Sequence, residues 1–494
     1  MTPDGLAARG EALHAALGRE YYLTGAGLKP DPEFQAIYQR YADLIDDEAV
    51  TVARASGVPA LFEWAVDLRV GRAVAPLEEA QLRWEQAAMV EVDRRRIPYL
   101  RVPIELQNAP DRAFRVALDA ARARAGRDGL AVDRARRFTV ERETVLAAAP
   151  AADYVAAVGR MSGVDLDALG QAAGALLAET DALYDDALAR LSRARLGRPP
   201  CDLVRADAAW LFRADQFDAA FPGDALLRTA TVQMEEMGLD ATEGGRVRFD
   251  TDDRDAKQPR AFCVPVRVPD EVYLVMRPHG GHADYRTFWH ELGHAMHYAA
   301  VDRGRPFHER WLGDHSVTEG FAMLWDHLTL DPAWLRRYTH LGQAGGTAER
   351  QRRDLVFEVS VAELYLLRRY AGKLRYELEL HRGTYDAAAL WERYAQYLTA
   401  ATRLRFSPDD ALIDVDPGFY AARYLRAWQL EASLAGVLTD RFDDDWYRNP
   451  RAGVFIRDLM QRGQSTPAHQ LAGEIVGGPL SFGPAVDRLA AVLT

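Results

Sequence analysis

One pentapeptide, His290-Glu291-Leu292-Gly293-His294, restricts the folds open to this 494-residue chain more than any other segment. Two histidines four positions apart lie on the same face of an α-helix, so both imidazoles can bind one metal ion. The glutamate between them lies near enough to that face to take a proton from a metal-bound water. The pattern therefore predicts a helix that carries a divalent-metal site, with one zinc ion per chain.

The third ligand that we expect is Glu319, which follows the pentapeptide by twenty-five residues. Catalytic zinc takes three protein ligands and keeps a position open for water. A competing interpretation exists, because Ser316-Val317-Thr318-Glu319 matches a capping box, in which the glutamate bonds back to the first residue's amide. The upstream histidines favour the ligand interpretation. His297, one turn beyond His294, is either a supporting or a packing residue.

Most of the chain has the apolar spacing of three and four that is typical of helices. Helices are predicted over residues 34–56, 77–97, 111–124, 151–160 and 165–195. Residues 245–277 differ, because short β-type runs over 261–268 and 272–276 flank Pro269-Asp270 and predict a hairpin. Pro265 lacks an amide hydrogen and suits an edge strand. Such an edge can accept an extended peptide by main-chain hydrogen bonds, although a purely structural hairpin is the alternative.

The metal helix is predicted from about residue 285 to residue 301, with Asp284 as its N-cap, and a second helix from about 317 to 328. We expect a mainly α-helical protein with two lobes facing a deep cleft, and a small β-hairpin or sheet next to the metal helix. Residues 1–200 would form one wall of the cleft. Residues 201–494 would form the catalytic region.

Charge and composition narrow the classes of partner. The net charge of −12 and the pI of about 5.6 argue against nucleic acid, which needs clustered positive charge. No stretch resembles a signal peptide or a membrane span, so we expect no membrane partner. Two cysteines without a Cys-x-x-Cys pair are compatible with a reducing cytoplasm.

The segment His290-Glu291-Leu292-Gly293-His294-Ala295-Met296-His297, followed by Val317-Thr318-Glu319-Gly320-Phe321, resembles the thimet oligopeptidase and oligoendopeptidase F family. These are zinc metallopeptidases with a helical fold around a deep cleft. The resemblance implies that His290, His294 and Glu319 bind zinc and that Glu291 is the general base.

A second segment, Gly418-Phe419-Tyr420-Ala421-Ala422-Arg423-Tyr424, is similar to the aromatic helix that supplies the family's transition-state tyrosine. The resemblance implies that Tyr424, or alternatively Tyr420, donates a hydrogen bond to the developing oxyanion, although aromatic residues at helical spacing also pack cores. The family has a histidine ten residues before this tyrosine. This chain has Asp414 there, and an ionised carboxylate cannot donate a hydrogen bond.

The resemblance implies zinc-dependent hydrolysis of peptide bonds in short or unfolded peptides, with the peptides as the partners. An oligoendopeptidase is the first expectation. The alternatives are a zinc exopeptidase, of carboxypeptidase or aminopeptidase type, and a catalytically impaired peptide-binding homologue, which Asp414 keeps open. Zinc-dependent hydrolysis of a non-peptide amide is a further possibility.

Overall fold

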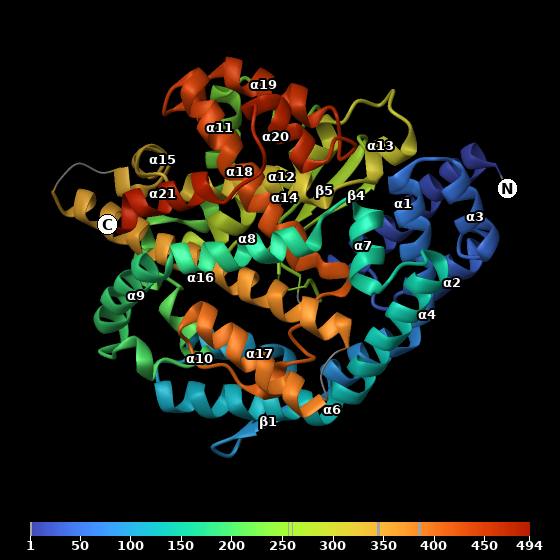
Figure 1. Ribbon diagram of the computed structural model, residues 1–494. Helices are drawn as coiled ribbons and strands as arrows, with labels where there is room; N and C mark the ends of the chain where they lie inside the picture. The colour runs from blue at the N-terminus through green and yellow to red at the C-terminus, as the bar shows by residue number, and fades with distance from the viewer. Residues whose placement is uncertain (1, 255, 259, 343–345, 384–386) are drawn as a thin grey trace. The chain divides into compact units, whose positions relative to one another are not determined.

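The computed structural model describes residues 2–254, 256–258, 260–342, 346–383 and 387–494 (Figure 1). The chain folds into two compact units, each assembled from three separate stretches of sequence. Unit 1 contains Met1–Ala65, Ala214–Val356 and Arg426–Arg488, and unit 2 contains Val66–Arg213, Phe357–Leu425 and Leu489–Thr494. The sequence-based division into a cleft wall over residues 1–200 and a catalytic region over residues 201–494 stays a prediction.

Unit 1 holds the sheet that neighbours the metal-binding motif. Its helices are α1 (Pro3–Gly25), α2 (Phe34–Arg40), α3 (Asp47–Ala55), α11 (Leu226–Glu236), α12 (His282–Ala300), α13 (Phe307–Trp311), α14 (His315–Asp326), α15 (Pro332–Tyr338), α19 (Pro450–Met460) and α20 (Ala468–Val476). Helices α4 (Pro59–Ala87), α16 (Gly346–Arg382), α18 (Tyr420–Phe442) and α21 (Gly483–Leu493) each contribute residues to both units.

The predicted hairpin is confirmed within a three-stranded sheet of order β3-β5-β4. Strands β4 (Phe262–Arg267) and β5 (Glu271–Val275) are antiparallel, and β3 (Val247–Asp250) pairs with β5 in parallel. Strand β4 lies at the edge of this sheet, so Pro265 is at an edge as predicted. One face of the sheet packs on Tyr22 of α1 and on Ala26, which directly follows that helix, and the other face packs on Ala295 and Ala299 of α12.

Both predicted metal-site helices exist, but they begin earlier than the sequence indicated. Helix α12 begins at His282 after Gly281, and the Asp284 carboxylate instead accepts hydrogen bonds from the amides of His279 and Gly280. Helix α14 begins at His315, and its N-cap is Asp314, whose side chain accepts from the Ser316 amide at 3.0 Å. The capping-box interpretation of Glu319 is therefore wrong, because the helix is capped by Asp314 and not by Ser316.

Unit 2 is built around the long helix α6. Its elements are β1 (Met89–Val92), β2 (Arg95–Pro98), α5 (Val102–Asn108), α6 (Arg112–Ala148), α7 (Tyr154–Ser162), α8 (Leu166–Glu179), α9 (Asp181–Leu196), α10 (Arg205–Leu211) and α17 (Ala387–Thr402), with parts of α4, α16, α18 and α21. The helix predicted over 77–97 is wrong beyond Ala87, because β1 and β2 form a hairpin there. Asp93 and Arg94 make its turn with positive φ, and Val90 and Ile97 face the core of this unit.

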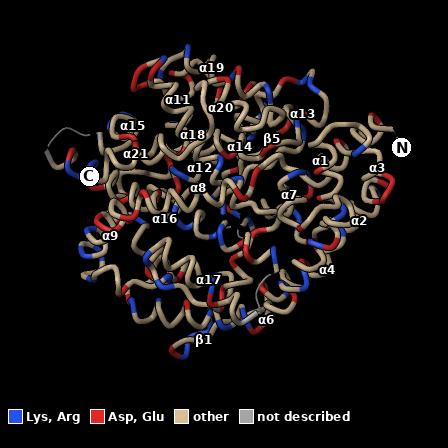
Figure 2. Tube along the Cα trace, in the orientation of Figure 1, with Lys and Arg blue, Asp and Glu red and all other residues tan. Residues whose placement is uncertain are grey.

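The fold class is thus confirmed as mainly α with a small sheet beside the metal helix, while the cleft stays a prediction. Figure 2 shows Lys and Arg, and likewise Asp and Glu, dispersed along the chain among uncharged residues. Within the described residues, no helix combines the length and apolar character needed to cross a membrane. Cys201 and Cys263 are both free thiols.

Candidate metal centre

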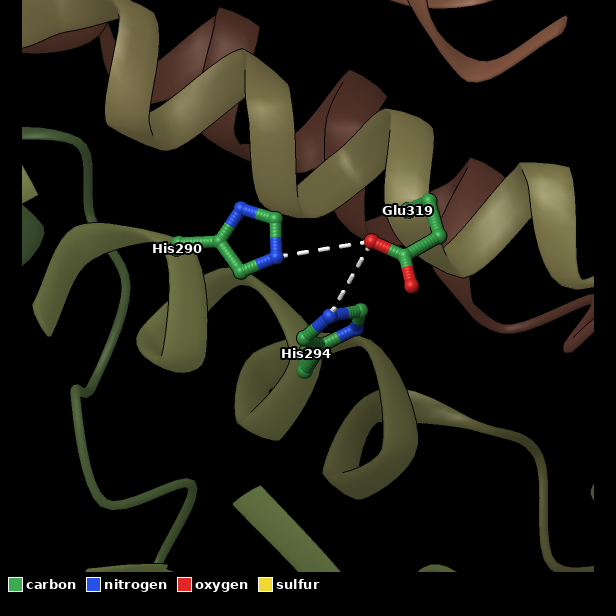
Figure 3. A group of neighbouring side chains, drawn as sticks. All are labelled: His290, His294 and Glu319. Atoms are coloured by element: carbon green, nitrogen blue, oxygen red, sulfur yellow. Dashed lines mark ion pairs between the residues drawn. The ribbon is translucent and has the colours of Figure 1, made fainter. Parts of the chain in front are cut away.

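Helices α12 and α14 pack closely in unit 1, and a glycine of the motif allows the contact. A Cβ atom added at Gly293 would lie 2.6 Å from the Cα atom of Ala322 and 2.6 Å from the Trp325 ring. Any larger residue would push α14 away, so the glycine sets the distance between the helices. The close approach brings Glu319 of α14 over the His290–His294 face of α12 (Figure 3).

The three predicted ligands converge on one point. The Oε2 atom of Glu319 lies 3.4 Å from Nε2 of His290 and 3.6 Å from Nε2 of His294. One donor atom from each residue lies within 4.8 Å of the other two. Donors about 2.0–2.2 Å from a tetrahedral zinc ion are about 3.3–3.6 Å apart, so the spacing of the carboxylate from both imidazoles fits that metal.

Two further side chains fix the orientation of the imidazole rings. The Nδ1 atom of His290 lies 2.8 Å from Oδ2 of Asp326, and Nδ1 of His294 lies 2.9 Å from Oγ1 of Thr318. The Asp326 carboxylate can only accept, so the His290 ring donates its Nδ1–H and keeps the Nε2 lone pair for a metal. The Thr318 hydroxyl can accept the same hydrogen from His294, which leaves Nε2 of that ring for a metal as well.

The metal-free cluster has the electrostatics of a cation site. Burial alone would lower the pKa of His290, but Asp326 and Glu319 outweigh it and raise the pKa to about 10. Burial alone would raise the pKa of Glu319, but His294 and His290 hold it far below its usual range. Without a metal, a proton on His290 thus takes the position of the positive charge that these groups are arranged to hold.

Glu291 lies beside this cluster and is not one of its three donors. Its Oε2 atom accepts a hydrogen bond of 2.8 Å from the backbone amide of Cys263 in β4. Burial raises the pKa of Glu291, and the neighbouring His294 and His290 offset part of the rise. A partly buried carboxylate with a raised pKa, held next to a metal site, has the properties of a general base.

The next histidine of α12, three residues beyond His294, is a packing residue. His297 is fully buried, and its ring lies 4.9 Å from the ring of Phe321 between centroids. Burial lowers the pKa of His297 to about 3, so this ring stays neutral. His297 therefore contributes to the packing of α12 against α14.

Tyr420 and Tyr424 both lie at the start of α18, in unit 2, whereas the three metal-binding candidates belong to unit 1. The Tyr424 ring packs against Tyr370 and Tyr420, with centroids 5.0 Å and 5.2 Å apart. The structure thus places the two tyrosines together, and their role toward a substrate stays a prediction.

Asp414 is held by an extensive set of partners within unit 2. A guanidinium nitrogen of Arg369 donates to both carboxylate oxygens at 2.6 Å, and the Tyr394 hydroxyl donates at 2.8 Å. The ammonium of Lys373 lies 3.7 Å away. Burial opposes ionisation, but Arg369 and Lys373 keep the pKa of Asp414 well below its usual range. The group at this position is therefore a carboxylate in a tight ion pair.

Sequence reasoning missed Asp326 and Thr318. Asp326 carried a usable signal, because it follows Glu319 by seven residues and so shares its face of the helix two turns later. Thr318 is adjacent to Glu319 in sequence and carried no comparable signal. The Cys263 amide is a backbone group, and only the three-dimensional arrangement shows its bond to Glu291.

No protein-family model matches this sequence, and no curated protein matches it. Solved structures do. A provisionally assigned peptidase from Chlamydophila abortus superimposes with a TM-score of 0.66 at 11% identity, covering 99% of this chain and 89% of that one. A provisionally assigned oligoendopeptidase F from Bacillus anthracis str. Ames gives a TM-score of 0.60 at 13% identity, covering 99% of this chain and 83% of that one. The chain therefore has the fold of these proteins, in agreement with the resemblance seen in its motifs.

Proposed function

We propose that this protein is a zinc-dependent peptidase that hydrolyses peptide bonds in short or unfolded peptides. The observation that carries the proposal is the convergence of His290, His294 and Glu319, with carboxylate-to-imidazole distances of 3.4 Å and 3.6 Å. Glu291 beside them supplies the acid–base group that hydrolysis requires. The fold shared with the two peptidase structures supports the same reaction class.

The donor set fits zinc rather than a hard cation. Two imidazoles and one carboxylate are a common catalytic zinc set, whereas calcium and magnesium prefer oxygen donors. The spacing and the tautomers described above agree with that choice. A zinc ion held by these three residues would supply Lewis acidity to the attacking water and to the scissile carbonyl.

The residues of the chain itself carry the proton transfers. Glu291 takes a proton from the attacking water and later delivers it to the leaving amine. Its raised pKa suits both steps, because a carboxylate that is too acidic would not hold the proton. The Cys263 amide donates to Oε2 of Glu291, which leaves the other oxygen to face the water. Tyr424, or alternatively Tyr420, would donate its hydroxyl hydrogen to the oxyanion.

Peptides are proposed as substrates because strand β4 is an edge strand adjacent to Glu291. An extended peptide can pair with such an edge, which gives affinity with little side-chain preference. Helix α1 packs closely against β4 at Pro265, where a Cβ atom added at Gly18 would lie 2.7 Å from the Pro265 carbonyl oxygen. The helix therefore restricts the part of β4 with which a peptide can pair. Internal cleavage is proposed first, and terminal cleavage is the alternative. The cytoplasmic setting also stays a proposal, and the free thiols are compatible with it.

The test is turnover of an internally quenched peptide library by the zinc-loaded protein, with the zinc-loaded Glu291→Gln variant as the control. We expect the wild type to cleave, a chelator to stop the cleavage, and the variant to bind zinc equally well without cleaving. Mass spectrometry of the products separates internal from terminal cleavage. If both proteins bind zinc and peptide and neither cleaves, the protein is a peptide-binding homologue and the proposal fails. Activity on acylated small molecules alone would also contradict it.

A further inference from the structure

A connected row of polar side chains leads from His290 to the surface of unit 1. Its first member is Asp326, at the end of α14, whose Oδ2 atom fixes Nδ1 of His290 at 2.8 Å. The other oxygen of Asp326 accepts from Nε of Arg286 at 3.3 Å. The Asp326 side chain is only 6% exposed, so its position depends on the groups packed around it.

The next member is His327, which follows Asp326 in sequence. Its Nε2 atom lies 3.6 Å from Oδ1 of Asp326, and a favourable contact with that carboxylate requires a hydrogen on Nε2. Its Nδ1 atom lies 2.9 Å from Oε2 of Glu431 and 3.0 Å from Nη2 of Arg488. The buried ring thus connects Asp326 to a second pair of charged residues.

That pair is formed by two C-terminal helices. Arg488 of α21 donates to both oxygens of Glu431 of α18, at 2.6 Å and 2.7 Å. Burial opposes the charge on Glu431, but Arg488 and His327 outweigh it and lower the pKa of Glu431 to about 2. Two parallel hydrogen bonds to an ionised, buried carboxylate make a strong and directional contact.

From these contacts we infer that Arg488, through Glu431, His327 and Asp326, positions His290 for the metal. The inference rests on the proposed function, and it extends the metal site to a residue whose sequence position lies 198 residues beyond the ligand that it positions. Arg488 is a positioning residue, because it acts on the ligand His290 through Glu431, His327 and Asp326.

Arg488 can be replaced without opening the core. Its side chain is 36% exposed, so Arg488→Gln leaves a surface position and not a cavity. The change removes the two hydrogen bonds that Arg488 donates to Glu431, and the carboxylate is then held less firmly. His327 loses its Arg488 contact and faces a less fixed Glu431, so Asp326 in turn holds His290 less firmly. A weaker hold on a ligand reduces the affinity for the metal.

Unit 1 offers a closely matched control. Arg457 of α19 donates to the buried carboxylate of Glu243 at 2.7 Å, with side chains 37% and 2% exposed. The Arg488–Glu431 pair has side chains 36% and 1% exposed. Arg457→Gln therefore breaks an ion pair of the same burial which, within the described residues, is not hydrogen-bonded to His290, His294 or Glu319.

The experiment measures the zinc dissociation constant by competition with a chromogenic chelator, together with the thermal midpoint of the metal-free proteins. We expect Arg488→Gln to weaken zinc binding about threefold to tenfold, at or below the lower end of the range for loss of a direct supporting partner. Arg457→Gln is expected to bind zinc like the wild type. Arg488→Lys, which keeps the charge but loses the paired hydrogen bonds, should lie between.

A double-variant cycle tests the route through Asp326. If Arg488 acts through Asp326, the effects of Arg488→Gln and Asp326→Asn on zinc affinity are not additive. Unchanged zinc affinity in Arg488→Gln, with or without a lower thermal midpoint, would overturn the inference and leave only a structural role. A wild type that binds no zinc would overturn the proposed function as well, so the two failures are distinguishable.

Discussion

The structure gives its most definite expectation for the replacement of Asp414 by histidine. Histidine is the residue that the oligopeptidase family described above has at the corresponding position. Asp414 neutralises Arg369 and Lys373 and accepts from the Tyr394 hydroxyl. A histidine supplies no negative charge, and if protonated it would repel both cations. We therefore expect Asp414→His to destabilise the segment before α18 without adding activity.

The size of the effect follows from the contacts. Breaking a buried ion pair costs about 3–5 kcal/mol when one charge is left behind. Arg369 and Asp414 are 19% and 21% exposed, so water replaces part of the lost interaction. Lys373 keeps Asp416 at 2.7 Å. We expect a loss of about 2–3 kcal/mol, which corresponds to about 30- to 150-fold more frequent local opening.

Hydrogen-exchange mass spectrometry over residues 410–418 measures this opening directly. The expected result is faster exchange of that segment in Asp414→His, with peptide turnover no higher than in the wild type. Asp414→Asn, which keeps one acceptor for Arg369, should show a smaller change. Unchanged exchange, or turnover that rises tenfold in the histidine variant, would refute the assignment of Asp414 as an ion-pair anchor.

Glu291, Thr318 and Glu377 each offer a further test. Glu291→Gln should lower peptide turnover by about 10²- to 10⁴-fold at unchanged zinc affinity, and a similar rate in both proteins would contradict a general-base role. Thr318→Val should weaken zinc binding about tenfold by removing the Nδ1 partner of His294, measured by chelator competition; equal affinities would count against it. Burial raises the pKa of Glu377 from 4.5 to about 8, so its contribution to stability is complete below pH 4.5 and is lost as the pH rises through about 8. Glu377→Gln should therefore reduce the fall in urea midpoint between about pH 6 and pH 9, and an identical fall would exclude Glu377 as its source.

The parts of the fold that local sequence determines were predicted well. Runs of β-branched residues around Pro269 predicted the β4–β5 hairpin, and the His-Glu-x-x-His spacing predicted the helix that carries both imidazoles. Local errors had local causes. The turn of the β1–β2 hairpin is made by Asp93 and Arg94 and contains no glycine or asparagine. Without that signal, the residues after Ala87 were predicted to continue the preceding helix.

What sequence reasoning could not supply depends on contacts between distant residues. Arg369 and Tyr394 reach Asp414 from 45 and 20 residues away, so the sequence did not reveal that its charge is neutralised. Arg488 meets Glu431 across 57 residues. The role of Gly293 also depends on the α12–α14 contact, because only a neighbouring helix makes its missing side chain important.

X-ray absorption spectroscopy at the zinc edge, on the protein loaded with one equivalent of zinc, tests the three-residue metal site most directly. We expect one tightly bound zinc per chain, with two imidazoles and oxygen donors at about 2.0–2.2 Å and no sulfur. Glu319→Ala should lose part of the oxygen signal and most of the affinity. A sulfur donor at about 2.3 Å, as Cys263 would give, or a spectrum unchanged in Glu319→Ala, would contradict the three-residue site.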